Sequence, residues 1–320
     1  MLAKLLRPLM ILLVLACPLC AQENASWTEA FPPFRIAGNV YYVGSKDLAS
    51  YLITTSKGNI IINSNLETSV PQIRESVEKL GFRFQDTKIL LISHAHWDHN
   101  AGSALLKEAT GAEYMVMDAD APEVESGGKG NFHYTKLYQP AKVDRVLHDG
   151  DKVKLDDTVL TAHLTPGHTK GCTTWTLQVH DSPVVSNNLA SNSKDEAGKP
   201  ATGNNAAGKS AAGKRAIDMK TYNVVIIGSP NVNAGFKLVN NDKYPQIASD
   251  YERTFRVLKS LSCDVFLSSH GSHYGMAEKY ARMKPGEANP FLDPMGYKAY
   301  VANREEAFRK ELAKQTAEAK

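Results

Sequence analysis

The sequence predicts an α/β fold, because strand-like and helix-like segments alternate over its first half. The helical spacing of Val70, Ile73 and Val77 predicts a helix over residues 70–80 that stops at Gly81. Short apolar runs with turn residues between them predict strands on either side. These strands cover residues 40–43, 49–54, 59–62 and 88–92, and a further helix and strand are predicted at 101–109 and 114–117.

The second half of the chain is richer in strands. They are predicted at residues 143–147, 152–155, 159–164, 172–179, 222–227 and 264–268. Two helices are predicted there, one over residues 247–261 and a charged closing helix over 297–317. The 320 residues and their 42% hydrophobic share supply enough apolar material for one large domain or two small ones.

The first residues have the order of a secretory leader. Lys4 and Arg7 precede a short apolar stretch, and small or neutral residues follow up to Ala21. The apolar stretch is shorter than the about 20 residues that a membrane-spanning helix needs. We therefore expect a signal peptide over residues 1–21, cleavage after Ala21 and a periplasmic location. A lipid anchor on Cys17 and a buried N-terminal helix are the alternatives.

Charge and cysteine content limit the partners and the covalent bonds that we expect. The formal net charge is +3, and two of those charges lie in the leader. The near-neutral remainder gives no reason to expect a nucleic-acid partner. Cys17 and Cys20 would be lost with the leader, which leaves Cys172 and Cys263. We expect two unpaired thiols, with a disulfide between them as the alternative.

One segment, residues 190–216, stands apart in composition. Its glycines recur every five residues, at Gly198, Gly203, Gly208 and Gly213. A period of five fits neither a helix nor a strand, and the segment has almost no apolar bulk to bury. We predict a flexible insertion, with a weak anion-binding tether built from its lysines and arginine as the alternative.

Four metal-binding side chains fall within the segment SHAHWDHNAG, residues 93–102, directly after a predicted strand. They are His94, His96, Asp98 and His99. Side chains two residues apart leave an extended segment on the same side, and strand ends in α/β sheets commonly form sites. A catalytic zinc ion usually has three protein ligands and one open position. The surplus of donors therefore predicts two ions.

Two more histidines follow predicted strands. His168 comes after a strand and a Pro-Gly turn, and His270 directly follows the last strand. His273 is a rival for the role of His270, whereas His163 lies inside a strand and is expected to be a packed histidine. The other histidines are expected at surfaces, turns or a pocket rim: His133, His148 and His180.

These motifs together resemble the metallo-β-lactamase superfamily. They are HAHWDH at residues 94–99, TPGHT at 165–169 and the histidine at a strand end, His270. Finer features are similar to the third subclass of class B metallo-β-lactamases: TPGHTKGCTTW at 165–175, GSPNVN at 228–233 and NPF at 289–291. The resemblance runs from about Trp27 to the closing helix.

The resemblance implies a four-layer αβ/βα sandwich over residues 22–320, with two zinc ions in a cleft at one edge of the sheets. The first Zn²⁺ would be held by His94, His96 and His168, and the second by Asp98, His99 and His270. Ser229, and with it Asn231, would contact the carboxylate of the substrate. No cysteine occupies the position of Ser229, as one would in the other main subclasses.

The activity that the resemblance implies is hydrolysis of the amide bond of β-lactam antibiotics, and hence antibiotic resistance. Water shared by two zinc ions ionises near neutral pH, so that zinc-bound hydroxide can attack without a covalent intermediate. Asp98 would orient that hydroxide, and the metal would stabilise the oxyanion. We expect a small-molecule substrate, no nucleic-acid partner, no membrane span and a monomer.

Two other functions share parts of this pattern. Thioesterases and lactonases of the same fold carry a bridging aspartate where this chain has Gly228-Ser229, so its absence disfavours them. A non-catalytic periplasmic zinc-binding protein is the other alternative. The chain also departs from the subclass at one point. The partner position for a disulfide to Cys263 is occupied by Tyr297, so that bond should be missing.

Overall fold

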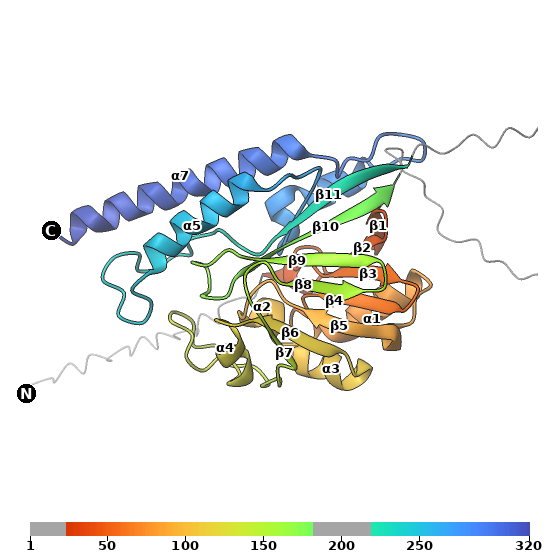
Figure 1. Cartoon of the computed structure of the whole chain (residues 1–320), viewed down its shortest axis with the longest axis horizontal. Coiled ribbons are helices and arrows are strands. Elements are labelled where there is room, and N and C mark those ends of the chain that lie inside the picture. The colour runs from red at the N-terminus through yellow and green to blue at the C-terminus, as the bar shows by residue number, and fades with distance from the viewer. Residues whose placement is uncertain (1–23, 182–218) are drawn as a thin grey trace, which may run out of the picture.

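A computed structural model of the chain describes residues 24–181 and 219–320. Two β-sheets are stacked face to face, and helices cover the outer side of each (Figure 1). This arrangement confirms the predicted α/β sandwich of the metallo-β-lactamase type. The predicted signal peptide, residues 1–21, and the predicted insertion, residues 190–216, lie outside the described residues.

The first sheet has seven strands in chain order. The strands from β1 to β4 are antiparallel, and those from β4 to β7 are parallel. Their bounds are β1 (Phe34–Ala37), β2 (Val40–Tyr42), β3 (Tyr51–Thr55), β4 (Gly58–Ile62), β5 (Thr87–Leu91), β6 (Glu113–Met117) and β7 (Arg145–Leu147). The parallel strands all end at the same edge of the sheet. The predicted metal ligands lie at this edge.

The second sheet has five strands in the order β12-β11-β10-β9-β8. Only β11 and β12 are parallel; the other pairs are antiparallel. Their bounds are β8 (Lys152–Leu155), β9 (Thr158–Leu164), β10 (Thr173–Asp181), β11 (Lys220–Ile227) and β12 (Val265–Ser268). The ladder between β10 and β11 continues to the pair Asp181↔Lys220, so the two ends of the chain that flank the undescribed segment lie side by side.

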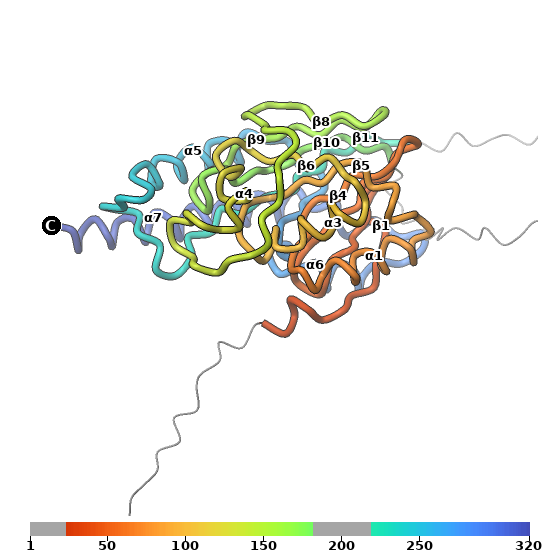
Figure 2. Tube along the Cα trace, turned by 90° about the horizontal axis from the view of Figure 1, so that it is seen from below, coloured from red at the N-terminus to blue at the C-terminus, as the bar shows by residue number. Residues whose placement is uncertain are grey.

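The helices form the two outer layers of the sandwich. On the side of the first sheet, which faces the viewer in Figure 2, lie α1 (Ser69–Lys79), α3 (Ser103–Thr110) and α4 (Ala121–Glu125). On the side of the second sheet lie α5 (Ile247–Ser260) and α7 (Pro294–Glu318) (Figure 1). The short elements are α2 (Trp97–Asn100), α6 (Met276–Ala281) and the 3₁₀ helices η1 (Ala25–Trp27), η2 (Phe84–Asp86) and η3 (Gly271–Tyr274). Among the described residues, no helix has the length and apolar character to cross a bilayer.

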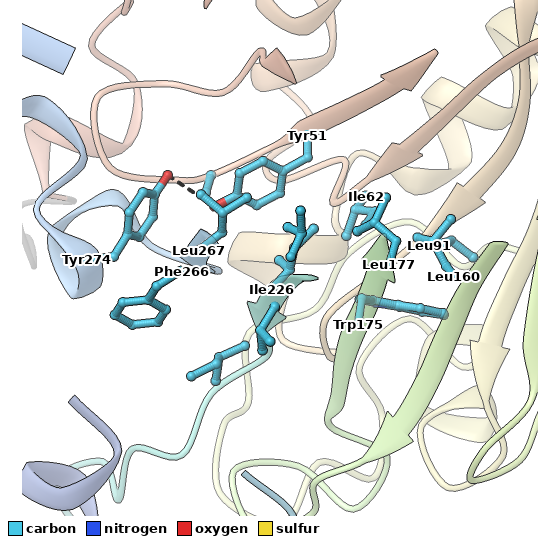
Figure 3. Close-up of a cluster of buried hydrophobic side chains, with 14 of the residues drawn as sticks. Tyr51, Ile62, Leu91, Leu160, Trp175, Leu177, Ile226, Phe266, Leu267 and Tyr274 are labelled. Atoms are coloured by element: carbon cyan, nitrogen blue, oxygen red, sulfur yellow. Dashed lines mark hydrogen bonds between the residues drawn. The ribbon is translucent and has the colours of Figure 1, made fainter. Parts of the chain in front are cut away.

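The main core lies between the two sheets. Ile60 and Ile62 of β4 face this core, whereas Ile61 between them packs on the other face with residues of α1 such as Ile73. This alternation is the period of two that a strand imposes, and both faces of the strand are buried because both are covered. Trp175 fills the inter-sheet space (Figure 3), and its indole N–H donates to the carbonyl of Ile92 at 3.1 Å.

The predicted elements are mostly present, with shifted ends. Helix α7 begins at Pro294, three residues before the predicted start, because the Asp293 side chain caps the Gly296 N–H at 2.7 Å. The sequence patterns missed β1, α4 and α6, which are only four to six residues long. Cys172 and Cys263 are buried and unpaired, as predicted.

Candidate metal centre

The six predicted ligands come from segments that meet at one edge of the two sheets. His94 to His99 follow β5 and enter α2, His168 lies between β9 and β10, and His270 follows β12. Backbone hydrogen bonds fix these segments to each other. The Thr173 N–H donates to the carbonyl of Ser93 at 2.8 Å, and the Ala49 N–H donates to that of Ser269 at 3.0 Å.

The first cluster contains three buried imidazoles, those of His94, His96 and His168. One nitrogen from each ring lies within 4.8 Å of the others. The ring centroids are 4.7 Å apart for His94–His168 and His96–His168, and 4.8 Å apart for His94–His96. Three imidazole nitrogens that converge in this way form a typical set of ligands for a catalytic zinc ion.

The second cluster contains Asp98, His99 and His270. The Nε2 atom of His99 lies 3.3 Å from Oδ2 of Asp98 and 3.2 Å from Nε2 of His270. Nε2 of His270 lies 3.6 Å from the same carboxylate oxygen. Ligand atoms bound tetrahedrally to one zinc ion lie about 3.3 Å apart, so these separations suit a shared ion. The rings of His94 and His99 are 4.4 Å apart, and the two clusters are therefore adjacent.

Unpaired nitrogen atoms show that the histidines fit a metal. Nδ1 and Nε2 of His94, Nε2 of His96 and Nδ1 of His99 are buried and find no hydrogen-bond partner within the described part of the chain. A buried polar atom without a partner costs stability, so native proteins rarely leave one. A bound metal ion would satisfy one nitrogen of His94 and Nε2 of His96, because a neutral imidazole offers one lone pair; the other ring nitrogen carries a proton and does not bind the metal.

The charge state of the first cluster also suits metal binding. Burial lowers the pKa of His94 and of His96 well below its usual value, and it lowers the pKa of His168 to about 4. These rings are therefore neutral at physiological pH. Only a neutral imidazole offers the lone pair that a metal ion requires.

The second cluster is more strongly charged. Burial raises the pKa of Asp98, but the neighbouring His99 and His270 outweigh it and hold that pKa below its ordinary value. Burial lowers the pKa of His270, but Asp47 and Asp98 outweigh it and raise that pKa to about 9. Asp98 therefore places negative charge where a divalent cation would lie, and Asp47 lies at the opposite edge of the His270 ring.

Asp47 orients His270 and was not anticipated from the sequence. Its Oδ2 atom lies 3.0 Å from Nδ1 of His270, and its Oδ1 atom accepts the Ser272 N–H at 2.9 Å. Such a carboxylate fixes the ring orientation and the tautomer of a metal-binding histidine. Asp47 lies 223 residues from His270 along the chain, and no local motif marks it.

His168 is held by the loop that follows β11. Its Nδ1 atom donates to the carbonyl of Asn231 at 2.8 Å, and the hydroxyl of Tyr251 donates to the same oxygen at 2.6 Å. Gly167 has φ of +127°, and a Cβ atom there would lie 2.7 Å from the ring of Tyr251. The Pro-Gly turn before His168 is therefore a geometric requirement, because only glycine fits so close to that ring.

The two predicted substrate contacts, Ser229 and Asn231, are both part of this loop. Ser229 is almost fully buried, and its hydroxyl accepts the Asn231 N–H at 3.4 Å. The side-chain amide of Asn231 contacts Nε2 of His273 at 3.1 Å, and its oxygen accepts the Tyr300 hydroxyl at 3.5 Å. Asn231 therefore touches the metal centre through its carbonyl, which supports His168.

The remaining histidines have other partners. Both ring nitrogens of His273 are engaged, Nδ1 with the Ser268 hydroxyl at 3.1 Å and Nε2 with Asn231. The ring of His163 contacts the Thr176 hydroxyl at 2.8 Å on the half-buried face of β9. His133, His148 and His180 contact Tyr134, Asp118 and Thr221 respectively.

Aromatic side chains surround the two clusters. Tyr134 packs on His96 with ring centroids 4.8 Å apart. Trp27 packs on Trp97 at 5.5 Å and on His270 at 5.9 Å, and the ammonium of Lys136 lies 3.2 Å above the ring of Trp97. No periodic pattern in the sequence predicts these aromatic neighbours, because they come from three separate segments.

This chain resembles known proteins in sequence and in fold. The Metallo-beta-lactamase superfamily profile matches residues 48–181. The native FEZ-1 metallo-beta-lactamase from Legionella gormanii is 50% identical, with a TM-score of 0.77 over 90% of this chain and 98% of that one. The class B3 di-zinc metallo-beta-lactamase LRA-12 from an Alaskan soil metagenome is 34% identical, with a TM-score of 0.74 over 90% and 97% of the two chains.

A more distant curated relative is the mitochondrial persulfide dioxygenase ETHE1 of Homo sapiens, which is 27% identical over 126 residues. That match covers 39% of this chain and 41% of the relative, so the chain spans about two fifths of the length of that relative. The likeness to FEZ-1, in contrast, extends over nearly the whole of both chains. Among the solved structures that resemble this chain over nine tenths of its length are members of subclass B3, and the chain belongs to the metallo-β-lactamase superfamily.

Proposed function

We propose that this protein is a zinc-dependent hydrolase of β-lactam antibiotics that binds two Zn²⁺ ions. The observation that carries the proposal is the convergence of six donor side chains into two adjacent clusters. The clusters comprise His94, His96 and His168, and Asp98, His99 and His270. The likeness to FEZ-1 and to the di-zinc LRA-12 supports both the reaction and the number of ions.

When bound, the two ions would supply a water that ionises near neutral pH and a Lewis acid for the lactam carbonyl. The residues of the chain prepare this chemistry. Burial keeps His94 and His96 neutral, so their nitrogens are available as ligands. Asp98 is ionised, and its carboxylate can accept a hydrogen bond from the attacking water and orient it. No serine or cysteine nucleophile is needed.

The surroundings of the clusters would recognise the substrate. We assign the Ser229 hydroxyl, at the end of β11, to the substrate carboxylate. The side chain of Asn231 is engaged with His273 and Tyr300, so Asn231 would help mainly by holding His168. The ammonium of Lys136 at the rim adds positive charge that complements a β-lactam carboxylate.

The cellular setting follows from the predicted leader. A signal peptide over residues 1–21 would export the chain to the periplasm, where β-lactams act on cell-wall synthesis. Hydrolysis there by a monomeric enzyme would confer antibiotic resistance. Expression in a sensitive Gram-negative host, with and without the leader, tests this setting: only the form that carries the leader should raise resistance.

Another metallo-hydrolase of the same fold is the second candidate, because curated relatives include a hydroxyacylglutathione hydrolase from Cereibacter sphaeroides, 33% identical over 105 residues. The end of β11 argues against it. Gly228 and Ser229 follow that strand where thioesterases of this fold would place a bridging aspartate.

The decisive experiment is hydrolysis of one penicillin, one cephalosporin and one carbapenem by the purified protein, with thioester and lactone substrates in parallel. We expect turnover of β-lactams that a chelator abolishes and added Zn²⁺ restores. Protein with two bound zinc ions that hydrolyses thioesters or lactones but none of the three β-lactams would refute the proposal.

A further inference from the structure

A buried carboxylate outside both clusters connects the segments that carry the first three ligands. Asp120, just before α4, is 1% exposed. Its Oδ2 atom accepts the Ala95 N–H at 2.9 Å and the Thr169 hydroxyl at 2.8 Å, and its Oδ1 atom accepts the Gly171 N–H at 2.7 Å. Ala95 lies between His94 and His96, and Thr169 follows His168.

The backbone of Gly171 packs tightly against Asp120. A Cβ atom on Gly171 would lie 2.5 Å from the backbone nitrogen of Asp120 and 2.7 Å from its Cβ, so only glycine permits the approach. The hydroxyl of Tyr138 donates to the Ala95 carbonyl at 2.8 Å. Both backbone polar groups of the residue between His94 and His96 are therefore fixed by side chains.

The three donors explain why a carboxylate can be buried here. Hydrogen bonds to an ionised acceptor are shorter and stronger than neutral ones, and these three offset part of its desolvation, although burial still raises the pKa of Asp120. Removing the carboxylate would leave the Ala95 and Gly171 N–H groups and the Thr169 hydroxyl without this acceptor. Two of these three donors belong to the His168 loop, and the third belongs to the turn between His94 and His96.

We propose that Asp120 is a positioning residue for the three-histidine metal site. Its carboxylate holds the turn of His94 and His96 and the loop of His168 at the separation that one ion requires. Asp120 touches neither the ion nor the substrate. The expected loss of turnover rests on the proposed function, whereas the expected loss of metal affinity does not.

The test compares a change that breaks the link with one on the same turn that does not. Asp120→Asn keeps the size of the side chain but turns an amide N–H₂ group toward hydrogen-bond donors. Asp118→Asn is the matched control, because Asp118 is two residues away and partly exposed and its partner is His148. Thr169→Val removes a single donor, and Thr169→Ser restores it.

The main readout is Zn²⁺ affinity, measured by competition with a chromophoric chelator, together with the absorption spectrum of the Co²⁺-substituted protein. We expect Asp120→Asn to weaken one of the two binding steps by about 10- to 100-fold, as loss of such an outer partner does in other metal sites. Thr169→Val should weaken the same step less, and Thr169→Ser and Asp118→Asn should leave it unchanged. In turnover assays at limiting Zn²⁺, kcat should fall while KM changes little.

The proposal is overturned if Asp120→Asn lowers resistance to urea but leaves both binding steps and the Co²⁺ spectrum unchanged, because the role would then be purely structural. If Asp120→Asn does not fold, the Thr169 pair decides, and equal Zn²⁺ affinity of the Val and Ser variants overturns the proposal. The metal titration needs no β-lactam. A protein that hydrolyses none would refute the proposed function without affecting this result.

Discussion

The two donor clusters lie side by side but are built in different ways. In the first, three neutral imidazoles are set by the backbone and by buried hydrogen bonds, as when the carbonyl of Asn231 accepts from His168. In the second, the carboxylate of Asp98 is itself one of the donors, and Oδ2 of Asp47 lies 3.0 Å from Nδ1 of His270. The first cluster carries no charge of its own, whereas two carboxylates accompany the second.

This difference indicates that the two clusters would have different chemical roles. Neutral ligands leave the charge of a bound cation uncompensated, which favours polarisation of a carbonyl oxygen. Carboxylates neutralise part of that charge and also offer oxygen atoms that can orient water. The first cluster therefore suits the electrophilic role and the second suits the delivery of the nucleophile.

Removal of metal should have the largest effect. Dialysis against a chelator should abolish β-lactam turnover, because the neutral imidazoles and Asp98 cannot ionise water by themselves. Added Zn²⁺ should restore it. The apo protein should also unfold at lower denaturant, since a ligand present at 1,000 times its Kd stabilises the folded state by about 4 kcal/mol. Turnover that persists after metal analysis shows complete removal would contradict the prediction.

Asp98 and His273 should differ strongly although both lie at the same edge. Asp98→Ala removes a donor of the second cluster and the group that orients water, so we expect kcat/KM to fall by about 10²- to 10⁴-fold. His273→Ala removes hydrogen bonds to Ser268 and Asn231 and should cost on the order of 1–3 kcal/mol of stability with both ions retained.

Metal content measured on each variant provides the check. If His273→Ala loses one ion and His270→Ala keeps both, the assignment of His270 to the second cluster is wrong. Urea unfolding of the same variants separates loss of fold from loss of metal.

The donors themselves could be predicted from the sequence because their pattern is local. The ligands His94 to His99 fall within six residues, and the other two follow apolar strands, whose carboxyl ends meet at a sheet edge. The α/β class could be predicted for the same reason, since strand and helix periodicities are local, whereas the four-layer sandwich followed only from the resemblance to the superfamily.

The residues that position these donors could not be predicted, because they approach only in the folded chain. Asp120 is 25 residues from Ala95 and 51 from Gly171, and Asp47 is 223 from His270. The carbonyl of Asn231 supports His168 through its backbone, and a backbone contact leaves no mark on residue type. Nothing in the local pattern separates such residues from ordinary turn residues.

Asp47→Asn should have a smaller effect than Asp98→Ala, and one confined to the second cluster. An amide can still accept the Ser272 N–H, but it holds His270 less firmly and carries no charge. We expect one Zn²⁺ binding step to weaken by about 10- to 100-fold. Combining it with Asp120→Asn in a double-mutant cycle tests independence: additive losses are expected if each acts on its own cluster.

The smallest effect is expected from shortening the segment between β10 and β11. The ladder of these strands starts beside the metal edge, near Thr173 and Ile227, and ends at Asp181↔Lys220. A strand rises about 3.3 Å per residue, so that far end is roughly 25 Å from the metal centre. Residues 190–216 also contain no histidine. Replacing them with an Asn-Gly turn should therefore leave zinc content unchanged and kcat/KM within about twofold. Each doubling of loop length costs about 0.6 kcal/mol, so the unfolding free energy should rise by on the order of 1 kcal/mol.

Full-length Lys209→Gln, Lys214→Gln and Arg215→Gln variants serve as the control for charge. If the shortened protein folds and binds two ions but has a much higher KM, and the charge variants share that KM, the segment contacts the substrate and the expectation fails.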